Sequence, residues 1–196
     1  MNGLRLLPQA IQGMREGKWQ VNLGRRVKGK TIGIWGYGKI GQRIAKYAST
    51  FEAEVLVWGS EESRKKALES GYGVAASKAE FFKSCDVVSL HLRLKDATSS
   101  IVTYEDLTMM KQNALLVNTA RAALIEKGAL LKALDFGRPG FAAIDVYDQE
   151  PIYTANHPLL LMDNVICTPH LGYVEKESYE LYFGIAFRNL LDYINQ

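Results

Sequence analysis

The chain has 196 residues, of which 47% are hydrophobic, and its formal net charge at pH 7 is +3. This size suffices for one substantial core but is small for two full domains, so we expect one main domain. The basic residues are scattered apart from two short clusters at 25–30 and 64–66, which lack the length and interleaved aromatic residues of a nucleic-acid track. No apolar run of about 18 residues and no secretory leader pattern occurs. We therefore expect neither a nucleic-acid partner nor membrane insertion.

The two cysteines, Cys85 and Cys167, both lie in strand-like apolar runs. Such cysteines are typical of small core residues in a reduced protein, which indicates a cytoplasmic location. The cysteines and the three histidines show no metal-ligand spacing, so we expect no metal site.

Strand and helix patterns alternate along the chain. The predicted elements begin with a short helix that stops near Gly17, a strand over 31–35, a helix from about 39, a strand over 54–58, a helix over 60–70 and a strand over 73–76. A helix over 79–83, a strand over 85–91, a helical turn over 104–110, a strand over 113–119 and a helix over 126–136 follow. The last predicted elements are strands over 141–146 and 164–168 and a long closing helix. This alternation and the right-handed crossover rule predict an α/β fold, a Rossmann-type doubly wound parallel sheet with flanking helices.

The two ends differ from the middle of the chain. We divide the chain into an N-terminal helix over 1–22, which is a possible dimer arm, a nucleotide-binding domain over 23–173, and a closing helix over 174–196. The first helix places Leu4, Leu7, Ile11 and Met14 on one face. The closing helix has a wide apolar side, and we expect its aromatic residues to pack on the domain or on a partner.

Three spaced glycines follow the first predicted strand. Gly36 permits a tight bend, Gly38 lets the backbone approach a pyrophosphate, and Gly41 lets the next helix pack closely on the sheet. Free N–H groups at the positive end of that helix would meet the phosphates. An ordinary packing turn is the alternative, but the flanking strand and helix patterns favour a dinucleotide site. The segment that we assign to it is Gly36, Tyr37, Gly38, Lys39, Ile40 and Gly41.

The choice of cofactor depends on the end of the second predicted strand. NAD sites usually place an acidic residue there, but Trp58 is followed by Gly59 and Ser60. Ser60 and Arg64 could receive a 2′-phosphate, whereas Glu61 or Glu62 could bind ribose hydroxyls and repel a phosphate. Both cofactors therefore remain candidates, with NADP slightly favoured over NAD.

Polar residues with useful chemistry follow four of the predicted strands. His91, Arg121, Asp145 with Glu150, and His170 each stand at or just beyond a carboxyl end. Ligands of such sheets bind at that edge. Each residue alone also has a structural explanation: a surface ion pair for the arginine, a turn for the glutamate and a hydrogen bond at a helix entry for the histidine.

Several segments together resemble the nucleotide-binding domain of the D-isomer-specific 2-hydroxyacid dehydrogenases. The approach to the glycine turn, 23–30, and the segments 115–121, 143–151 and 157–172 occur in the family's order. The resemblance implies transfer of a hydride between a nicotinamide cofactor and a small 2-oxo or 2-hydroxy acid. It leaves glyoxylate, hydroxypyruvate and bulkier oxo acids open as substrates.

The resemblance implies three catalytic residues. Arg121 holds the substrate carboxylate and carbonyl oxygen through a planar fork, and His170 supplies the proton. Glu150 fixes the tautomer of His170 and favours its imidazolium. Asp145 accepts from the nicotinamide amide, and His91 lines the cofactor cleft through its backbone without a chemical step. The remaining implied cofactor contacts are Thr119, Ala120, Arg121, His170 and Gly172.

The family also implies what is missing. Its members place a smaller substrate lobe before the equivalent of Asn2, and the chain lacks it. We expect an exposed cleft, unless another chain covers it, and a homodimer to which the first helix contributes. Three interpretations remain open: an oxidoreductase domain, a dinucleotide-binding regulatory or interaction module, and an inactive truncated product. Intact Arg121, Glu150 and His170 favour the first.

Overall fold

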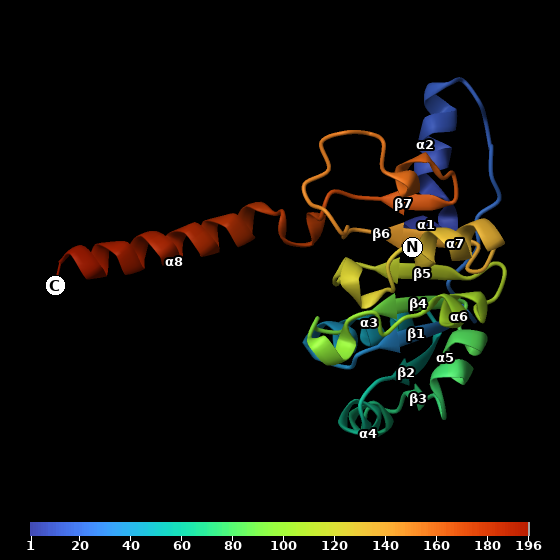
Figure 1. Ribbon diagram of the computed structural model, residues 1–196, viewed down its shortest axis with the longest axis horizontal. Helices are drawn as coiled ribbons and strands as arrows, with labels where there is room; N and C mark the ends of the chain where they lie inside the picture. The colour runs from blue at the N-terminus through green and yellow to red at the C-terminus, as the bar shows by residue number, and fades with distance from the viewer. Residues whose placement is uncertain (196) are drawn as a thin grey trace.

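The computed structural model describes residues 1–195 and shows one seven-stranded sheet with helices on both faces (Figure 1). All neighbouring strands are parallel, in the order β3-β2-β1-β4-β5-β6-β7. The strands are β1 Thr31–Trp35, β2 Glu54–Trp58, β3 Gly73–Val74, β4 Val87–Leu90, β5 Leu115–Asn118, β6 Phe141–Ile144 and β7 Val165–Cys167. The chain winds from β1 outward to one edge and then to the other, which confirms the predicted doubly wound sheet.

The helices fall into two layers. Helices α3 and α4 pack against β1, β2 and β3, whereas α5, α6 and α7 form a contiguous layer on the other face. The helices are α1 Asn2–Arg5, α2 Leu7–Arg15, α3 Lys39–Thr50, α4 Glu61–Glu69, α5 Lys78–Ser84, α6 Tyr104–Thr108, α7 Ala129–Phe136 and α8 Lys176–Ile194, with 3₁₀ turns η1 Asp96–Thr98, η2 Ala122–Leu124, η3 Pro158–Leu161 and η4 Leu171–Tyr173. Because all the strands are parallel, each connection returns the chain to the amino ends of the strands. The loops that follow the strands therefore all lie at the carboxyl ends.

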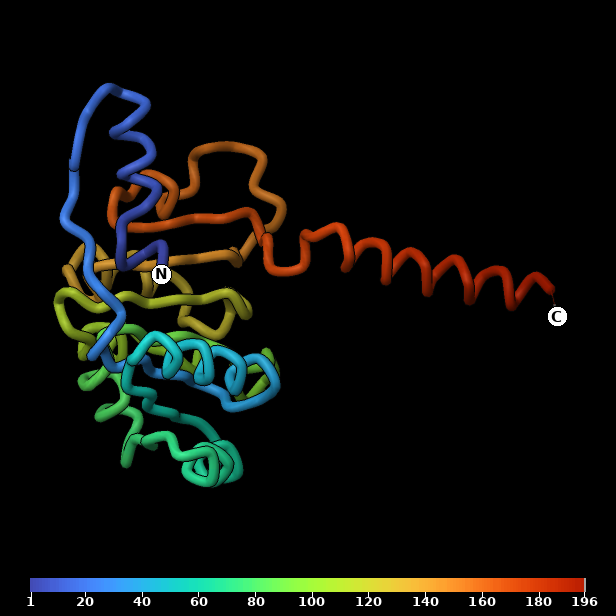
Figure 2. The backbone as a smooth tube through the Cα atoms, turned by 180° about the vertical axis from the view of Figure 1, so that it is seen from behind, coloured from blue at the N-terminus to red at the C-terminus, as the bar shows by residue number. Residues whose placement is uncertain are grey.

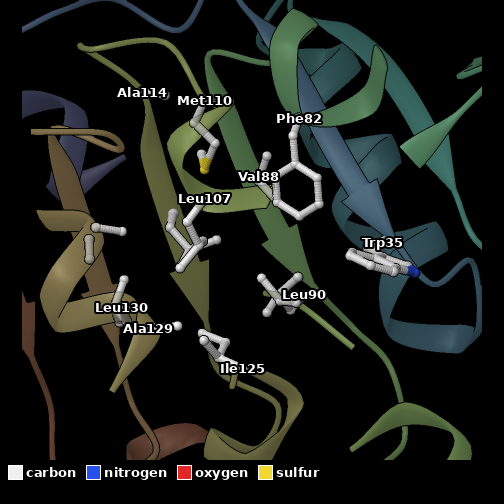
Figure 3. Packing of buried hydrophobic residues seen from close by; sticks show 14 of the residues in the cluster. Trp35, Phe82, Val88, Leu90, Leu107, Met110, Ala114, Ile125, Ala129 and Leu130 are labelled. Atoms are coloured by element: carbon white, nitrogen blue, oxygen red, sulfur yellow. The ribbon is translucent and has the colours of Figure 1, made fainter. Parts of the chain in front are cut away.

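Each face of the sheet has its own core cluster. Along β1, Ile32 and Ile34 belong to the cluster under α3 and α4, and Trp35 belongs to the cluster under α5, α6 and α7 (Figure 3). A Cβ on Gly33 would lie 2.8 Å from the ring of Phe81, so the glycine lets α5 pack directly on β1. Trp35 and the neighbouring Phe81 meet edge to face, 6.1 Å apart. The carboxyl end of β1, which carries the glycine turn, is thus packed on both faces.

The N-terminal segment differs from the single helix that we expected. It forms two helices, α1 and α2, separated at Leu6, whose φ of 50° lies in the left-handed region. Pro8 explains the break, because a proline in the middle of a continuous helix would remove a hydrogen bond and collide with the preceding turn. In the first turn of α2 it does neither. Leu4 is buried against the sheet, whereas Ile11 and Met14 are exposed.

The last helix, α8, extends away from the rest of the molecule in both views (Figures 1 and 2). None of its described residues is buried. We expected this helix to pack either on the domain of the same chain or on a partner. In the structure it does not pack on the domain, so packing on a partner is the remaining alternative. Among residues 1–195, no helix has the length and apolar character needed to cross a membrane.

Candidate active site

The turn after β1 has the geometry that a dinucleotide needs. Gly36 has a φ of 100°, and a Cβ there would lie 2.8 Å from the carbonyl oxygen of His91. A Cβ on Gly41 would lie 2.1 Å from the carbonyl oxygen of Gly36, so only glycine allows α3 to start this close to the strand. Beside Gly38 the space is open. The bend at Gly36 and the close approach at Gly41 are as predicted from the sequence, and the open space beside Gly38 leaves room for the predicted phosphate.

The helix that follows the turn is suited to an anion. Gly38 is the N-cap of α3, and the first turn of the helix contains no acidic residue. Lys39 is exposed at the first position, and the side chain of Ile40 is also largely exposed, whereas Tyr37 is buried against Tyr72. Unpaired N–H groups and the helix dipole favour negative charge at this end.

The end of β2 brings two of the predicted cofactor residues together. The guanidinium of Arg64 lies over the ring of Trp58, with Cζ 4.8 Å from the ring centroid. The Ser60 hydroxyl caps α4 by accepting from the Ser63 N–H at 3.3 Å. The carboxylate of Glu62 forms an ion pair with Lys66 at 2.5 Å. This pairing occupies one of the two acidic groups that could oppose a phosphate.

His91 follows β4 and lies directly beside the glycine turn. Its backbone N–H donates to the carbonyl of Trp35 at 2.8 Å, and its Nε2 lies 2.9 Å from the hydroxyl of Ser89. Burial lowers the pKa of His91 to about 4, so the imidazole is neutral near pH 7. The geometry agrees with a lining role and offers no charge for chemistry.

Arg121 is presented by a short loop after β5. Its side chain is exposed, and its Nη1 donates to the carbonyl of Ala120 at 2.5 Å. Within residues 1–195 no carboxylate forms an ion pair with Arg121, and no hydrogen bond joins it to Glu150 or His170. Thr119, in the same loop, is also exposed. The guanidinium therefore stands on the ligand-binding edge with its charge uncompensated by the described residues.

Asp145 has more partners in its own chain than we expected of a group that binds nicotinamide. Its Oδ1 accepts from the Thr168 hydroxyl at 2.5 Å and from the Leu171 N–H at 2.8 Å, and its Oδ2 accepts from the Gly172 N–H at 3.2 Å. The buried carboxylate thus joins the end of β6 to the loop that carries His170. Oδ2, which has a single long bond, keeps capacity for a further donor.

Glu150 and His170 form the closest pair in the site. Oε2 of Glu150 lies 2.7 Å from Nδ1 of His170, and Oε1 accepts from the backbone N–H of Tyr147 at 2.7 Å. Partial burial acts to raise the pKa of Glu150, but the bonds from His170 and from the Tyr147 N–H outweigh it and hold that pKa below its usual value. The carboxylate is ionised and points at one ring nitrogen, which leaves Nε2 for another partner.

The backbone around His170 is unusual. His170 has a φ of 54°, in the left-handed region, and its N–H donates to the Thr168 carbonyl at 3.0 Å.

A cavity of about 640 Å³ opens beside the Glu150–His170 pair. Its walls are Tyr147, Glu150, Pro151, Ile152, Tyr153, Thr154, Ala155, Leu160, Cys167, Thr168, Pro169, His170 and Tyr173. The imidazole edge therefore meets a space large enough for a small organic acid.

Three residues that build the site were not predicted from the sequence. Asn118, Thr168 and Tyr147 hold the loops of Arg121, Asp145 and Glu150 through hydrogen bonds to backbone or carboxylate groups. Asn118 had a signal, because a polar residue that ends an apolar strand must find partners once it is buried. Among residues 1–195, no group of three or more His, Cys, Asp or Glu residues could hold a metal ion.

Comparison with known proteins identifies the type of domain. A family model described as "D-isomer specific 2-hydroxyacid dehydrogenase, NAD binding domain" matches residues 1–172. The glyoxylate reductase of Aeropyrum pernix is 34% identical over 197 residues, which cover 95% of this chain and 58% of that protein.

Two solved structures are more similar still. An oxidoreductase from Ralstonia solanacearum has 51% identity and a TM-score of 0.96, covering all of this chain and 60% of that one. A phosphoglycerate oxidoreductase from Vibrio cholerae O395 has 53% identity and a TM-score of 0.94, covering 99% of this chain and 63% of that one. The chain thus spans about three fifths of the length of each of these three relatives.

Proposed function

Because the chain belongs to the D-isomer specific 2-hydroxyacid dehydrogenase family, as an NAD binding domain, we propose that it serves the reduction of a small 2-oxo acid to a 2-hydroxy acid. The observation that carries the proposal is the 2.7 Å contact between Glu150 and His170, on the same edge of the sheet as the glycine turn. An ionised acid paired to one nitrogen of an imidazole is an arrangement suited to proton transfer.

The residues of the turn fit a dinucleotide. The open space beside Gly38, the N-terminus of α3 and the exposed Lys39 offer backbone donors and positive charge to a pyrophosphate. We assign the amide end of the cofactor to the Oδ2 atom of Asp145. A nicotinamide cofactor bound here would supply the hydride for the substrate ketone.

Arg121 and His170 divide the substrate between them in this proposal. The exposed guanidinium of Arg121 binds the carboxylate of the oxo acid through two N–H groups. Nε2 of His170 donates a proton to the ketone oxygen as it becomes an alkoxide, and takes that proton back in the reverse reaction. Glu150 accepts from Nδ1, so it orients the ring and stabilises the imidazolium.

We propose NADP over NAD as the preferred cofactor. Support comes from Arg64, whose guanidinium lies over the ring of Trp58, from Ser60 at the N-cap of the same helix, and from the Glu62–Lys66 ion pair. Arg64→Ala should weaken NADPH binding about tenfold and leave NADH binding nearly unchanged, because only the 2′-phosphate needs the positive charge. Separate titrations with the two cofactors measure this, and tighter binding of NADH by the original chain would contradict the preference.

We also propose that the chain acts as a cytoplasmic homodimer and together with a second lobe. Both cysteines are free, which suits a reducing compartment. Ile11, Met14 and Trp19, in α2 and the segment after it, are exposed apolar residues that a second copy would cover. The exposed apolar residues of helix α8 would bind this second lobe, and the matched relatives are longer than this chain by enough residues to contain one. Sedimentation at several concentrations, with Met14→Glu as the dissociating variant, tests the dimer.

An assay with glyoxylate and hydroxypyruvate tests the function. We expect slow oxidation of NADPH by the chain at high concentration, and none by His170→Ala, which keeps the turn intact. If the chain oxidises neither NADPH nor NADH, catalysis by this chain alone is excluded. Retained cofactor binding would then favour a dinucleotide-sensing module, and loss of binding would favour an inactive product.

A further inference from the structure

Asn118 is the last residue of β5 and the most deeply buried asparagine of the described chain, with 1% of its surface exposed. The strand positions before it are apolar, so an amide here needs partners of its own. It finds them in the three residues that follow. Its Oδ1 accepts from the Ala120 N–H at 3.1 Å, and its Nδ2 donates to the Arg121 carbonyl at 2.9 Å.

These two bonds hold the N–H of Ala120 and the carbonyl of Arg121, which flank the peptide bond between the two residues. The backbone of Asn118 is fixed as well, because its carbonyl accepts from the Asp145 N–H at 3.0 Å and the strand pairs with β4 and β6. The loop is therefore tied to the centre of the sheet by one side chain. Among the described residues, no other side chain donates to or accepts from the backbone of 119–121 except that of Arg121 itself.

We propose that Asn118 is a positioning residue for Arg121: its side chain sets the backbone of residues 120–121 so that the guanidinium faces the substrate carboxylate. This inference depends on the function proposed above for Arg121. Without the amide, the partly buried Ala120 N–H loses its partner, and the Arg121 carbonyl keeps only the bond from the Leu124 N–H at 3.3 Å. The loop then loses the side chain that ties it to β5 and rearranges to pair these groups. A displaced guanidinium loses the two-point geometry that distinguishes it from a mobile positive charge.

The test measures two ligands in a double-mutant cycle. The probes are oxamate, an unreactive analogue of a 2-oxo acid, titrated into the NADPH-saturated chain, and NADPH itself. We expect Asn118→Ala to weaken oxamate binding about tenfold. The loss of NADPH affinity should be clearly smaller, because this loop supplies only part of the assigned cofactor contacts. In the Arg121→Ala background, the same substitution should have no further effect on oxamate.

Two further variants keep the test sharp. Asn118→Asp is nearly isosteric and keeps the acceptor for the Ala120 N–H, so it reports on the lost donor even if the alanine variant folds poorly. Asn164→Ala is the matched control, because Asn164 also bonds a backbone carbonyl, that of Gly140 at 2.9 Å, but at the opposite edge of the sheet. We expect it to leave oxamate binding unchanged.

Three results would overturn the inference: equal losses of oxamate binding from Asn118→Ala in both backgrounds, a loss of NADPH binding as large as that of oxamate binding, or no loss of oxamate binding. A failure of the proposed function looks different. In that case the original chain binds NADPH but not oxamate, or Arg121→Ala binds oxamate as well as the original chain.

Discussion

The two halves of the ligand-binding edge are built by different means. After β1, the cradle for phosphate consists of six consecutive residues and depends on the backbone, because Gly36 and Gly41 carry no side chain where one would collide. After β5, β6 and β7, the site consists of side chains from three separate loops, held together by hydrogen bonds to Asn118, Asp145 and Glu150. At Gly36 and Gly41 the first half has no room for a side chain, whereas the second half depends on its hydrogen-bond donors and acceptors.

The largest effect is expected in the first half. Gly41→Val places a branched side chain where even a Cβ lies 2.1 Å from the Gly36 carbonyl oxygen, so α3 must move away from β1. We expect a loss of more than about 3 kcal/mol in the free energy of unfolding and no measurable NADPH binding. Calorimetry and cofactor titration measure the two quantities.

Gly38→Ala is the control for this prediction, because nothing lies within 4 Å of its Cβ position. It should keep the thermal stability and weaken cofactor binding only. Equal stability losses in the two glycine variants would show that the turn does not depend on close approach of the backbone.

The next effect belongs to the second half. His170→Ala should lower kcat/KM for oxo-acid reduction by a factor of about 10²–10⁴, since it removes the proton donor, and should weaken NADPH binding by a much smaller factor. Steady-state kinetics and a separate cofactor titration measure this contrast. An equal loss of cofactor binding would mean that the two halves are not separable.

His91 lies where the two halves meet, and its expected effect is on acid stability. It takes up a proton at about pH 6.5 when unfolded but only near pH 4 when folded. Stability is therefore complete above about pH 6.5 and falls as the pH is lowered towards 4, by roughly 3 kcal/mol at most.

The matched variant is His91→Gln, which retains groups that can bond Ser89 but does not titrate. Denaturant unfolding at several pH values should show a flatter slope for this variant between pH 4 and 6.5. Parallel slopes for the two proteins would contradict the buried neutral state.

The smallest effect concerns the Glu150–His170 contact. Because the folded pKa of Glu150 is lowered, its contribution to stability is present above the usual glutamate pKa and is lost as the pH falls through the folded value. Both side chains are about one third exposed, so the contribution is about 0.5–1 kcal/mol. Glu150→Gln should remove it at pH 7, and the difference between the two proteins should shrink as the pH falls through the folded pKa of Glu150, as followed by thermal unfolding.

The same contrast explains what the sequence could predict. The seven strands, their order of winding and the glycine turn could be predicted from local patterns. Hydrophobic periodicity and the conformational freedom of glycine are properties of residues close together in the sequence. The pairing of Glu150 with His170 came from a family resemblance and is present in the structure. The three partners that Asp145 finds in its own chain lie far from it in sequence, and a single sequence has no direct signal for such bonds. The bonds of Asn118 are local, and its position at the end of an apolar strand indicated a need for partners but not which groups they are.

The break at Leu6 has a similar cause. Pro8 was visible in the sequence, but the helical spacing of Leu4, Leu7 and Ile11 predicted a continuous helix across it. Apolar spacing reports which residues share a face only while the backbone stays helical. Here the backbone constraint of proline overrides the pattern.

Helix α8 carries a consequence for the heat of unfolding. Since none of its described residues is buried, melting it hydrates little new apolar surface and adds little to the change in heat capacity. A lone helix of its 19 residues is also only marginally stable in water. The calorimetric transition of the free chain should therefore have the enthalpy and heat-capacity increment of the residues that precede α8. A larger increment is expected only when a partner or a second lobe is bound to that helix.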